Sequence, residues 1–205
     1  MKNNFGWTGT LLRIELPSGT ATRCRTSDYG DDFIGGRALA SRIYWDEVSE
    51  ATGALSPENV LMIMPGPLAG TPATACSRWV MAAKSPYYYP DQYSFGNCGG
   101  FFGAAIKFAG YDGLIIKGKA KTLSYLLIEN DRVELRDATG LRGLASDDTL
   151  AKLQAAHGGN EKLQPPLRQR RAQEDCLQRQ PLGRKPVERR KRRNGNTARE
   201  EGDGG

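Results

Sequence analysis

A glycine-rich stretch, Phe95–Gly118, constrains the fold of this chain more than any other part of its sequence. Glycines at positions 96, 99, 100, 103 and 110 surround a short run, Phe101–Ala109. Within this run, apolar residues stand at helical spacing at Phe101, Ala104, Ala105 and Phe108. Gly110 follows where the C-terminal cap of a helix belongs. Because Gly99-Gly100 lacks Cβ atoms, the sequence predicts a turn before a helix N-terminus that lets the backbone approach a flat or anionic ligand.

Elsewhere, alternating and continuous apolar patterns predict an α+β domain with mixed or antiparallel sheets and a few short helices. Strands are expected at Thr10–Leu16, Thr20–Thr26, Val60–Met64, Arg78–Lys84, Leu114–Lys117, Leu123–Glu129 and Arg132–Arg136. Helices are expected at Arg37–Val48 and at Asp147–Ala156, the second capped by Ser146. Tyr87–Tyr93 is rich in tyrosine and proline and is expected to be a loop, whereas Asn130-Asp131 is expected to be a hairpin turn.

The composition changes near His157 and divides the chain into a body, residues 1–157, and a tail, residues 158–205. The segment Asn160–Gly205 holds 13 Lys and Arg against 7 Asp and Glu, which accounts for the whole formal charge of +6. This segment contains no Ile, Phe, Tyr, Trp or Met. Such a segment cannot bury enough apolar surface to offset its ordering entropy, so we expect the tail to be disordered.

Neither a targeting signal nor a membrane span is visible in the sequence. The N-terminal residues lack an apolar signal region, and no apolar run approaches the roughly 20 residues that a membrane-spanning helix needs. The cysteines, at positions 24, 76, 98 and 176, show no ligand spacing, and the chain has 1 histidine. We therefore expect a cytoplasmic protein without a histidine-based metal site.

A series of short motifs, from about Phe5 to about Gly143, resembles the start of the aldehyde ferredoxin oxidoreductase family, the tungsten-pterin enzymes of anaerobes. The motifs follow the order and spacing of the family, and they are Gly6–Gly9, Phe33–Leu39, Leu55–Asn59, Gly66–Thr71, Ser77-Arg78, Lys84–Pro86, Asn97–Gly103, Lys107–Asp112 and Ile116–Ala120. The resemblance implies that the body is the α+β N-terminal domain of such an enzyme. In the family, this domain forms the base for the cofactor.

The resemblance also implies the cofactors and the reaction of the parent enzyme. A tungsten (or molybdenum) atom is held by two pyranopterin (molybdopterin) dithiolenes, and a magnesium ion joins their phosphates. A [4Fe–4S] cluster passes electrons to ferredoxin while an aldehyde is oxidised to a carboxylic acid. The implied partners of the parent are therefore ferredoxin and an aldehyde, with a homodimer as a possible assembly.

Four residues carry the cofactor site by this resemblance. Arg78 matches an arginine that contacts the pterin, and Asn97 matches an asparagine whose backbone carbonyl helps to hold the magnesium ion. Gly99 and Gly100 match glycines that lie against the pterin. On residue type alone, Arg78 is more often a surface arginine and the glycine pair more often a plain turn, and the resemblance reverses these interpretations. An arginine fork suits a phosphate, and Mg²⁺ prefers hard oxygen ligands.

The sequence departs from the family after about Ala156. The cysteines that bind the iron–sulfur cluster belong to later domains, so none of its ligands is expected in this chain, and the second half of the pterin site is replaced by the basic tail. We hypothesise that the chain is a frameshifted, truncated gene product. By itself it is then expected to be inactive and poorly stable, because a cradle without its cofactor and partner domains exposes apolar surface.

Two other functions remain open from the sequence. Related tungsten subunits reduce aromatic acyl-CoA esters, and the N-terminal third of the family does not distinguish them from aldehyde-oxidising enzymes. Alternatively, the basic cluster Arg189–Arg193 of the tail could neutralise the phosphates of nucleic acid. We expect such binding to be nonspecific and nucleic acid to be an unlikely partner, because the tail has no aromatic side chain that could stack on bases.

Overall fold

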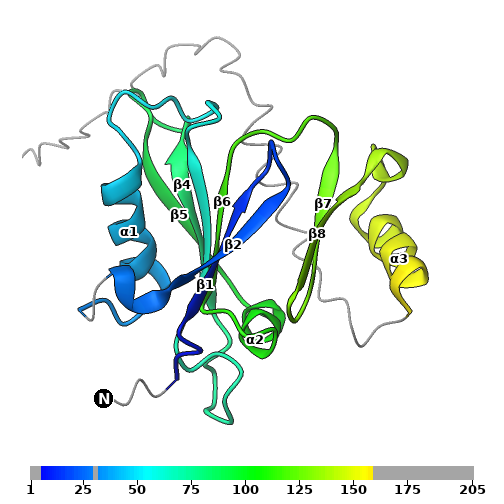
Figure 1. The fold of residues 1–205 in the computed structure, drawn as a ribbon, viewed down its shortest axis with the longest axis horizontal. Coiled ribbons are helices and arrows are strands. Elements are labelled where there is room, and N and C mark those ends of the chain that lie inside the picture. Colours follow the sequence, from blue (N-terminus) through cyan, green and yellow to red (C-terminus); the bar gives the residue numbers. More distant parts are fainter. Residues whose placement is uncertain (1–5, 30–31, 159–205) are drawn as a thin grey trace, which may run out of the picture.

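The computed structural model describes residues 6–29 and 32–158, which form a six-stranded mixed sheet, a separate two-stranded sheet and three α-helices (Figure 1). The strands are β1 (Thr10–Glu15), β2 (Thr20–Arg25), β3 (Val60–Pro65), β4 (Trp79–Ser85), β5 (Gln92–Cys98), β6 (Gly113–Lys117), β7 (Ser124–Glu129) and β8 (Arg132–Asp137). The helices are α1 (Gly36–Glu47), α2 (Phe102–Phe108) and α3 (Ser146–His157), with short 3₁₀ turns η1 (Thr26–Tyr29) and η2 (Thr139–Leu141). The α+β fold class is therefore confirmed.

The main sheet has the strand order β2-β1-β6-β3-β4-β5. Strands β1 and β6 pair in parallel, whereas all the other neighbours in this sheet are antiparallel. Strands β7 and β8 form a hairpin of their own. Because β5 lies at one edge, its second side carries no partner strand among the described residues.

Both faces of the main sheet are covered, which explains why its central strands are apolar on both sides. Helix α1 packs on one face, where its Leu39 and Ile43 join Met62 of β3 and Val80 of β4 in one core cluster. A second cluster lies on the opposite face, with α2 and the β7–β8 hairpin beside it (Figure 1). Its buried members are Leu12, Ile14, Ile63, Trp79, Ile106, Tyr111 and Leu114.

Every predicted strand and helix agrees with the structure to within one residue at each end. However, β5 is an additional strand where we expected a loop followed by a glycine turn. Its sequence carries glycine and polar residues, but seven backbone pairs with β4 hold it in the sheet. The strand signal was weak because an edge strand needs few apolar side chains.

The structure shows which face of one predicted helix is buried, and it contradicts the predicted cap of another. Of the four apolar residues at helical spacing, Ala104 is buried, whereas Phe101 and Phe108 are 71% and 73% exposed. The other buried residues of α2 are Gly103 and Ile106. Helical spacing alone does not tell which of two apolar stripes meets the sheet. Ser146 does not cap α3, because it is the first helical residue and Ala145 occupies the N-cap position without a side-chain hydrogen bond.

Three further expectations concern the Asn130 turn, membrane-spanning helices and the tail. The Asn130 turn is confirmed, and this residue adopts a positive φ of 52° between β7 and β8. No described helix is long and apolar enough to span a membrane. The expected disorder of the tail and its basic cluster lie outside the described residues, which end at Gly158.

Candidate functional site

The four residues predicted to bind a cofactor lie together at one corner of the main sheet. Arg78 immediately precedes β4, Asn97 is the penultimate residue of β5, and Gly99 and Gly100 follow β5 directly. Strands β4 and β5 are antiparallel neighbours in which Val80 pairs with Asn97. Since Trp79 pairs with Cys98, one further step in the same register sets Arg78 opposite Gly99. Residues about twenty positions apart in the sequence thus meet at one end of a hairpin.

The site lies on the face of the sheet that α1 covers. Cross-strand partners in a sheet point to the same face, and side chains alternate along each strand. Val80, the partner of Asn97, is buried in the core cluster beneath α1. Asn97 therefore belongs to the α1 side of the sheet, and Arg78 has the same parity as Val80. Arg78 and Asn97 are both exposed, which leaves their polar groups accessible to a ligand.

The glycines at this corner border open space. A Cβ atom added at Gly96, Gly99 or Gly100 would meet no heavy atom within 4 Å. In contrast, a Cβ at Gly103, only a few residues later in α2, would lie 3.3 Å from the Trp79 side chain. Packing therefore explains Gly103 but does not explain Gly99. Gly99 fits a surface that a flat group approaches closely.

The side chain of Trp79 fixes the position of the Gly99-Gly100 turn. Its indole N–H donates a 3.2 Å hydrogen bond to the carbonyl oxygen of Gly99. The Trp79 side chain is buried, and it contacts the Phe102 ring at the start of α2 in an edge-on arrangement, with the ring centroids 4.8 Å apart. The turn is thus fixed to the core by one hydrogen bond and one aromatic contact, so its backbone is preorganised.

A buried ion pair anchors α2 at the same end of the sheet. The ammonium of Lys107 contacts the carboxylate of Asp112, and both side chains are almost fully buried. The same carboxylate accepts 2.8 Å hydrogen bonds from the backbone N–H groups of Thr8 and Gly9 and a 2.6 Å bond from the Thr26 hydroxyl. Lys107 also donates to the Gly6 carbonyl oxygen at 2.7 Å. The motifs Gly6–Gly9 and Lys107–Asp112 are both visible in the sequence, but the sequence gives no sign that they contact each other.

Cys98 lies within the candidate site, between Asn97 and Gly99, and its thiol is half-buried. Burial raises the pKa of the Cys98 thiol above its ordinary value. A raised pKa keeps the thiol protonated near neutral pH, and the protonated form is a poor nucleophile and a poor metal ligand. The environment of Cys98 therefore suits a small packing residue rather than a reactive group.

The donors at this corner suit an anionic cofactor better than a metal bound by side chains alone. Among the described residues, no group of three His, Cys, Asp or Glu side chains could hold a metal ion. The corner instead offers a guanidinium, an amide and exposed glycine backbone. Guanidinium N–H groups bind phosphates, and carbonyl oxygens serve as ligands for Mg²⁺. A phosphorylated, flat cofactor with an associated Mg²⁺ ion fits this donor set.

Comparisons with known proteins show the family to which this sequence is similar. Residues 11–164 match the family model described as aldehyde ferredoxin oxidoreductase, N-terminal domain. The chain is 35% identical over 161 residues to the tungsten-containing aldehyde ferredoxin oxidoreductase of Thermococcus kodakarensis, a match that covers 77% of this chain and 26% of the relative. An aliphatic sulfonate oxidoreductase, WOR-like subunit, of Pyrococcus furiosus is 37% identical over 163 residues, covering 72% and 24% of the two chains.

A solved structure is similar to this chain in both fold and sequence. The active site complex BamBC of benzoyl coenzyme A reductase, in complex with 1,5 dienoyl-CoA, matches with a TM-score of 0.71 and 34% identity. This match covers 77% of the present chain and 24% of the matched chain. The chain therefore spans about a quarter of the length of the relatives that it matches.

Proposed function

Because the chain belongs to the aldehyde ferredoxin oxidoreductase family, we propose that its described residues hold one side of the pterin cofactor of a tungsten or molybdenum oxidoreductase. The observation that carries this proposal is the convergence of Arg78, Asn97 and Gly99 at one corner of the sheet. The open space beside Gly99 supports it, because the backbone there is accessible to a flat ring system.

Each residue of the corner has its own role in this proposal. Arg78 donates hydrogen bonds from its planar fork to the pterin or its phosphate. The backbone carbonyl of Asn97 contributes an oxygen ligand to a phosphate-bound Mg²⁺ ion. Gly99 and Gly100 let the ring system lie against the backbone. When bound, the metal dithiolene supplies the two-electron redox chemistry, while this domain supplies binding and orientation.

For the parent enzyme we propose the oxidation of aldehydes to carboxylic acids with ferredoxin as electron acceptor. The names of the relatives support this activity, since several are tungsten-containing aldehyde ferredoxin oxidoreductases. The activity belongs to a protein about four times as long as the matched part of this chain. We therefore propose that the isolated chain binds the pterin weakly and is inactive, because the iron–sulfur ligands and the opposite wall of the pterin site belong to the remainder of the parent.

A second candidate function has its own support. The matched benzoyl coenzyme A reductase complex is 34% identical to this chain, which is nearly the identity of the aldehyde oxidoreductases. A role as a fragment of the active-site subunit of an aromatic acyl-CoA reductase would use the same pterin cradle. The two candidates differ in the substrate pocket, which we expect to lie mostly outside this domain.

The proposal is tested by titrating the purified full-length chain with neopterin monophosphate, a stable phosphorylated pterin, and following the pterin fluorescence. We expect saturable binding that is weakened about tenfold or more by Gly99→Val, because the added side chain would occupy the space of the ring system. Gly140→Val is the matched control, since Gly140 also borders open space but lies far along the chain in η2. A folded chain that shows no binding, or equal binding by both variants, would contradict the proposal.

Metal analysis tests the inactivity of the isolated chain. The chain is produced under anaerobic conditions with tungstate or molybdate and purified, and its metal, iron and phosphorylated pterin contents are measured. We expect substoichiometric pterin, no iron and no aldehyde-dependent ferredoxin reduction. Stoichiometric tungsten and iron would show instead that this chain holds a complete centre.

A further inference from the structure

We propose that Arg37, in the first turn of α1, is a further phosphate-binding residue of the candidate site. This inference rests on the proposed function, because it concerns the phosphate of the same pterin. Arg37 stands in the segment Phe33–Leu39, whose sequence motif does not by itself indicate a ligand. Three independent features of the structure support the assignment, namely the position of α1, the lack of a carboxylate partner for Arg37 among the described residues and an unfavourable local placement of its charge.

The first feature is the position of the start of α1. Gly35 and Gly36 have positive φ angles of 121° and 54°, so the chain turns sharply into the helix. A Cβ atom at Gly35 would lie 3.1 Å from the Trp7 ring and 3.2 Å from Pro67, so the turn is packed tightly against the segment that follows β3. The neighbouring Gly66 N–H donates to the carbonyl oxygen of Arg78 at 3.4 Å. The beginnings of α1 and β4 are thereby held at the same end of the sheet.

The direction of α1 brings its first turn toward Asn97. Farther along the helix, the Ser41 hydroxyl donates to the Tyr93 hydroxyl at 3.1 Å, near the start of β5. In the first turn, the guanidinium carbon of Arg37 lies 4.7 Å from the centroid of the Phe95 ring, farther along the same strand. Phe95 precedes Asn97 by two residues and therefore shares its face. The helix runs antiparallel to β5, and Arg37 lies at the end that carries the candidate site.

The second feature is the charge of Arg37, as its surroundings in the described part of the chain show it. No described carboxylate lies within ion-pair distance of Arg37, whereas Arg42 on the same helix pairs with Asp46 at 2.8 Å. Stacking on the Phe95 ring fixes the guanidinium plane but leaves its N–H edges available to an acceptor. The side chain is exposed, so an anionic ligand can reach it. Arg78 likewise lacks a carboxylate partner among the described residues, so two unpaired guanidinium groups flank the strand end of Asn97.

The third feature is the unfavourable placement of this charge within the helix. The first turn of a helix favours acidic residues, because its free N–H groups and the macrodipole create positive potential there. The first turn of α1 contains no acidic residue and has no side-chain cap, yet it contains Arg37. This local arrangement costs helix stability, and a bound phosphate would offset that cost. Violations of a local rule of this kind are characteristic of functional sites.

The test compares a pterin with and without a phosphate on the full-length chain. Neopterin monophosphate and neopterin are each titrated into the wild type, Arg37→Ala and Arg37→Lys by fluorescence. We expect Arg37→Ala to weaken binding of the phosphorylated pterin about tenfold or more, with partial recovery in Arg37→Lys. We expect the binding of neopterin to be nearly unchanged. Arg42→Ala is the matched control on the same helix and is expected to bind both compounds like the wild type.

The outcomes separate this inference from the proposed function. If the wild type binds and Arg78→Ala weakens binding but Arg37→Ala does not, Arg37 is not a ligand and the proposed cradle stands. If Arg37→Ala weakens the binding of both compounds equally, Arg37 acts only by packing on Phe95, and the inference is again overturned. If the folded wild type binds neither compound, the proposed function fails together with the inference. Circular dichroism of each variant establishes that the compared chains are folded.

Discussion

At the scale of single residues, Asp112 holds together several segments that are distant in the sequence. It joins α2, η1 and the loop before β1 through one carboxylate, across up to 104 residues of sequence. We predict that Asp112→Asn destabilises the folded chain by about 3 kcal/mol, because it leaves the Lys107 ammonium buried without its counter-charge. Urea unfolding followed by circular dichroism measures this change.

Asp46→Asn provides the matched control for Asp112→Asn. Asp46 pairs with Arg42 across one turn of α1, and both side chains are considerably exposed. Solvent screens such a pair, so we expect a loss of only about 0.5 kcal/mol or less. Equal effects of the two substitutions would show that the buried pair contributes no more than an exposed one.

Tyr29 makes the folding stability of the chain depend on pH in the alkaline range. Its hydroxyl lies between Arg13 of β1 and Glu47 of α1, accepting from the guanidinium and donating to the carboxylate at 3.0 Å. Burial, followed by the Glu47 carboxylate, raises the pKa of Tyr29 to about 12 from its ordinary value of 10.0. The hydroxyl of Tyr29 holds its proton more tightly in the folded chain than in the unfolded chain. It therefore stabilises the fold at pH values below the pKa that it has in the unfolded chain. This contribution is lost as the pH rises from about 10 to about 12.

We predict that stability falls between pH 10 and pH 12 by about 1 kcal/mol more in the wild type than in Tyr29→Phe. This figure is smaller than the full pKa difference implies, because the hydroxyl is only half-buried and solvent screens it. Denaturant unfolding at several pH values measures the difference, and tyrosinate absorbance reports the titration directly. Parallel pH profiles for the two proteins would contradict the assignment.

At the scale of secondary-structure elements, two glycines have opposite roles. Gly113 begins β6, where an added Cβ would lie 2.2 Å from the Met64 sulfur and 3.1 Å from the Ile63 carbonyl oxygen. We predict that Gly113→Ala destabilises the chain by about 1–3 kcal/mol, because the central strands cannot separate without loss of core packing. Thermal unfolding gives the comparison with Gly99→Ala, which borders open space and should change stability by less than about 1 kcal/mol.

Gly99→Ala then separates a binding role from a packing role. The φ angle of Gly99 is not positive, so alanine is tolerated there, whereas Gly100 at φ 83° is strained by any side chain. We therefore expect Gly99→Ala to weaken binding of neopterin monophosphate while the melting temperature is retained. If Gly99→Ala instead lowers stability as much as Gly113→Ala does, the turn is a packing feature and the glycine is not reserved for a ligand.

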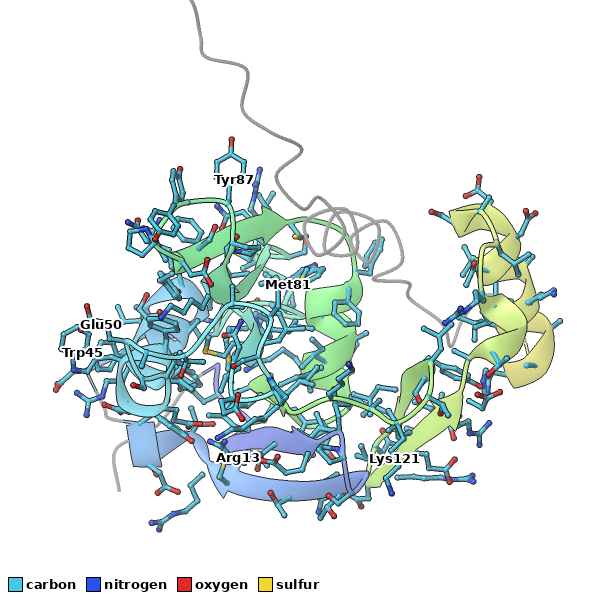
Figure 2. The ribbon with its side chains drawn as sticks, turned by 90° about the horizontal axis from the view of Figure 1, so that it is seen from above. Arg13, Trp45, Glu50, Met81, Tyr87 and Lys121 are labelled. Atoms are coloured by element: carbon cyan, nitrogen blue, oxygen red, sulfur yellow. The ribbon has the colours of Figure 1, made fainter. Side chains whose placement is uncertain are left out.

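At the scale of the whole molecule, large apolar side chains lie exposed around its surface. Figure 2 shows Trp45 and Tyr87 at the outer edge of the molecule, and both side chains are largely exposed. Phe101, which immediately precedes α2, and Phe108, the last residue of α2, are exposed near the candidate site. The relatives are about four times as long as the matched region.

We predict that the isolated chain self-associates through these apolar side chains. The double variant Phe101→Ser with Phe108→Ser should sediment as a smaller species and bind less of an apolar fluorescent dye than the wild type. Its free energy of unfolding should stay within about 1 kcal/mol of the wild type, because exposed side chains contribute little burial. Unchanged sedimentation of the double variant would show that another surface drives association.

The sequence by itself determined the order and the approximate ends of most elements. Alternation along β1 and β4, and glycine or proline at the intervening turns, are local signals that depend on residues close together in the chain. The resemblance likewise predicts that the cofactor is bound by Arg78, Asn97, Gly99 and Gly100, and these roles stay a prediction.

Only the tertiary structure decided which segments meet. The pairing of β5 with β4, the exposure of Phe101, the ion pair between Lys107 and Asp112, and the approach of Arg37 to Phe95 all depend on contacts between distant segments. Such contacts follow from the packing of both faces of one sheet and from the hydrogen-bonding needs of buried polar groups. The local pattern of residues carries no record of these partners, whereas the folded chain brings them to one end of the sheet.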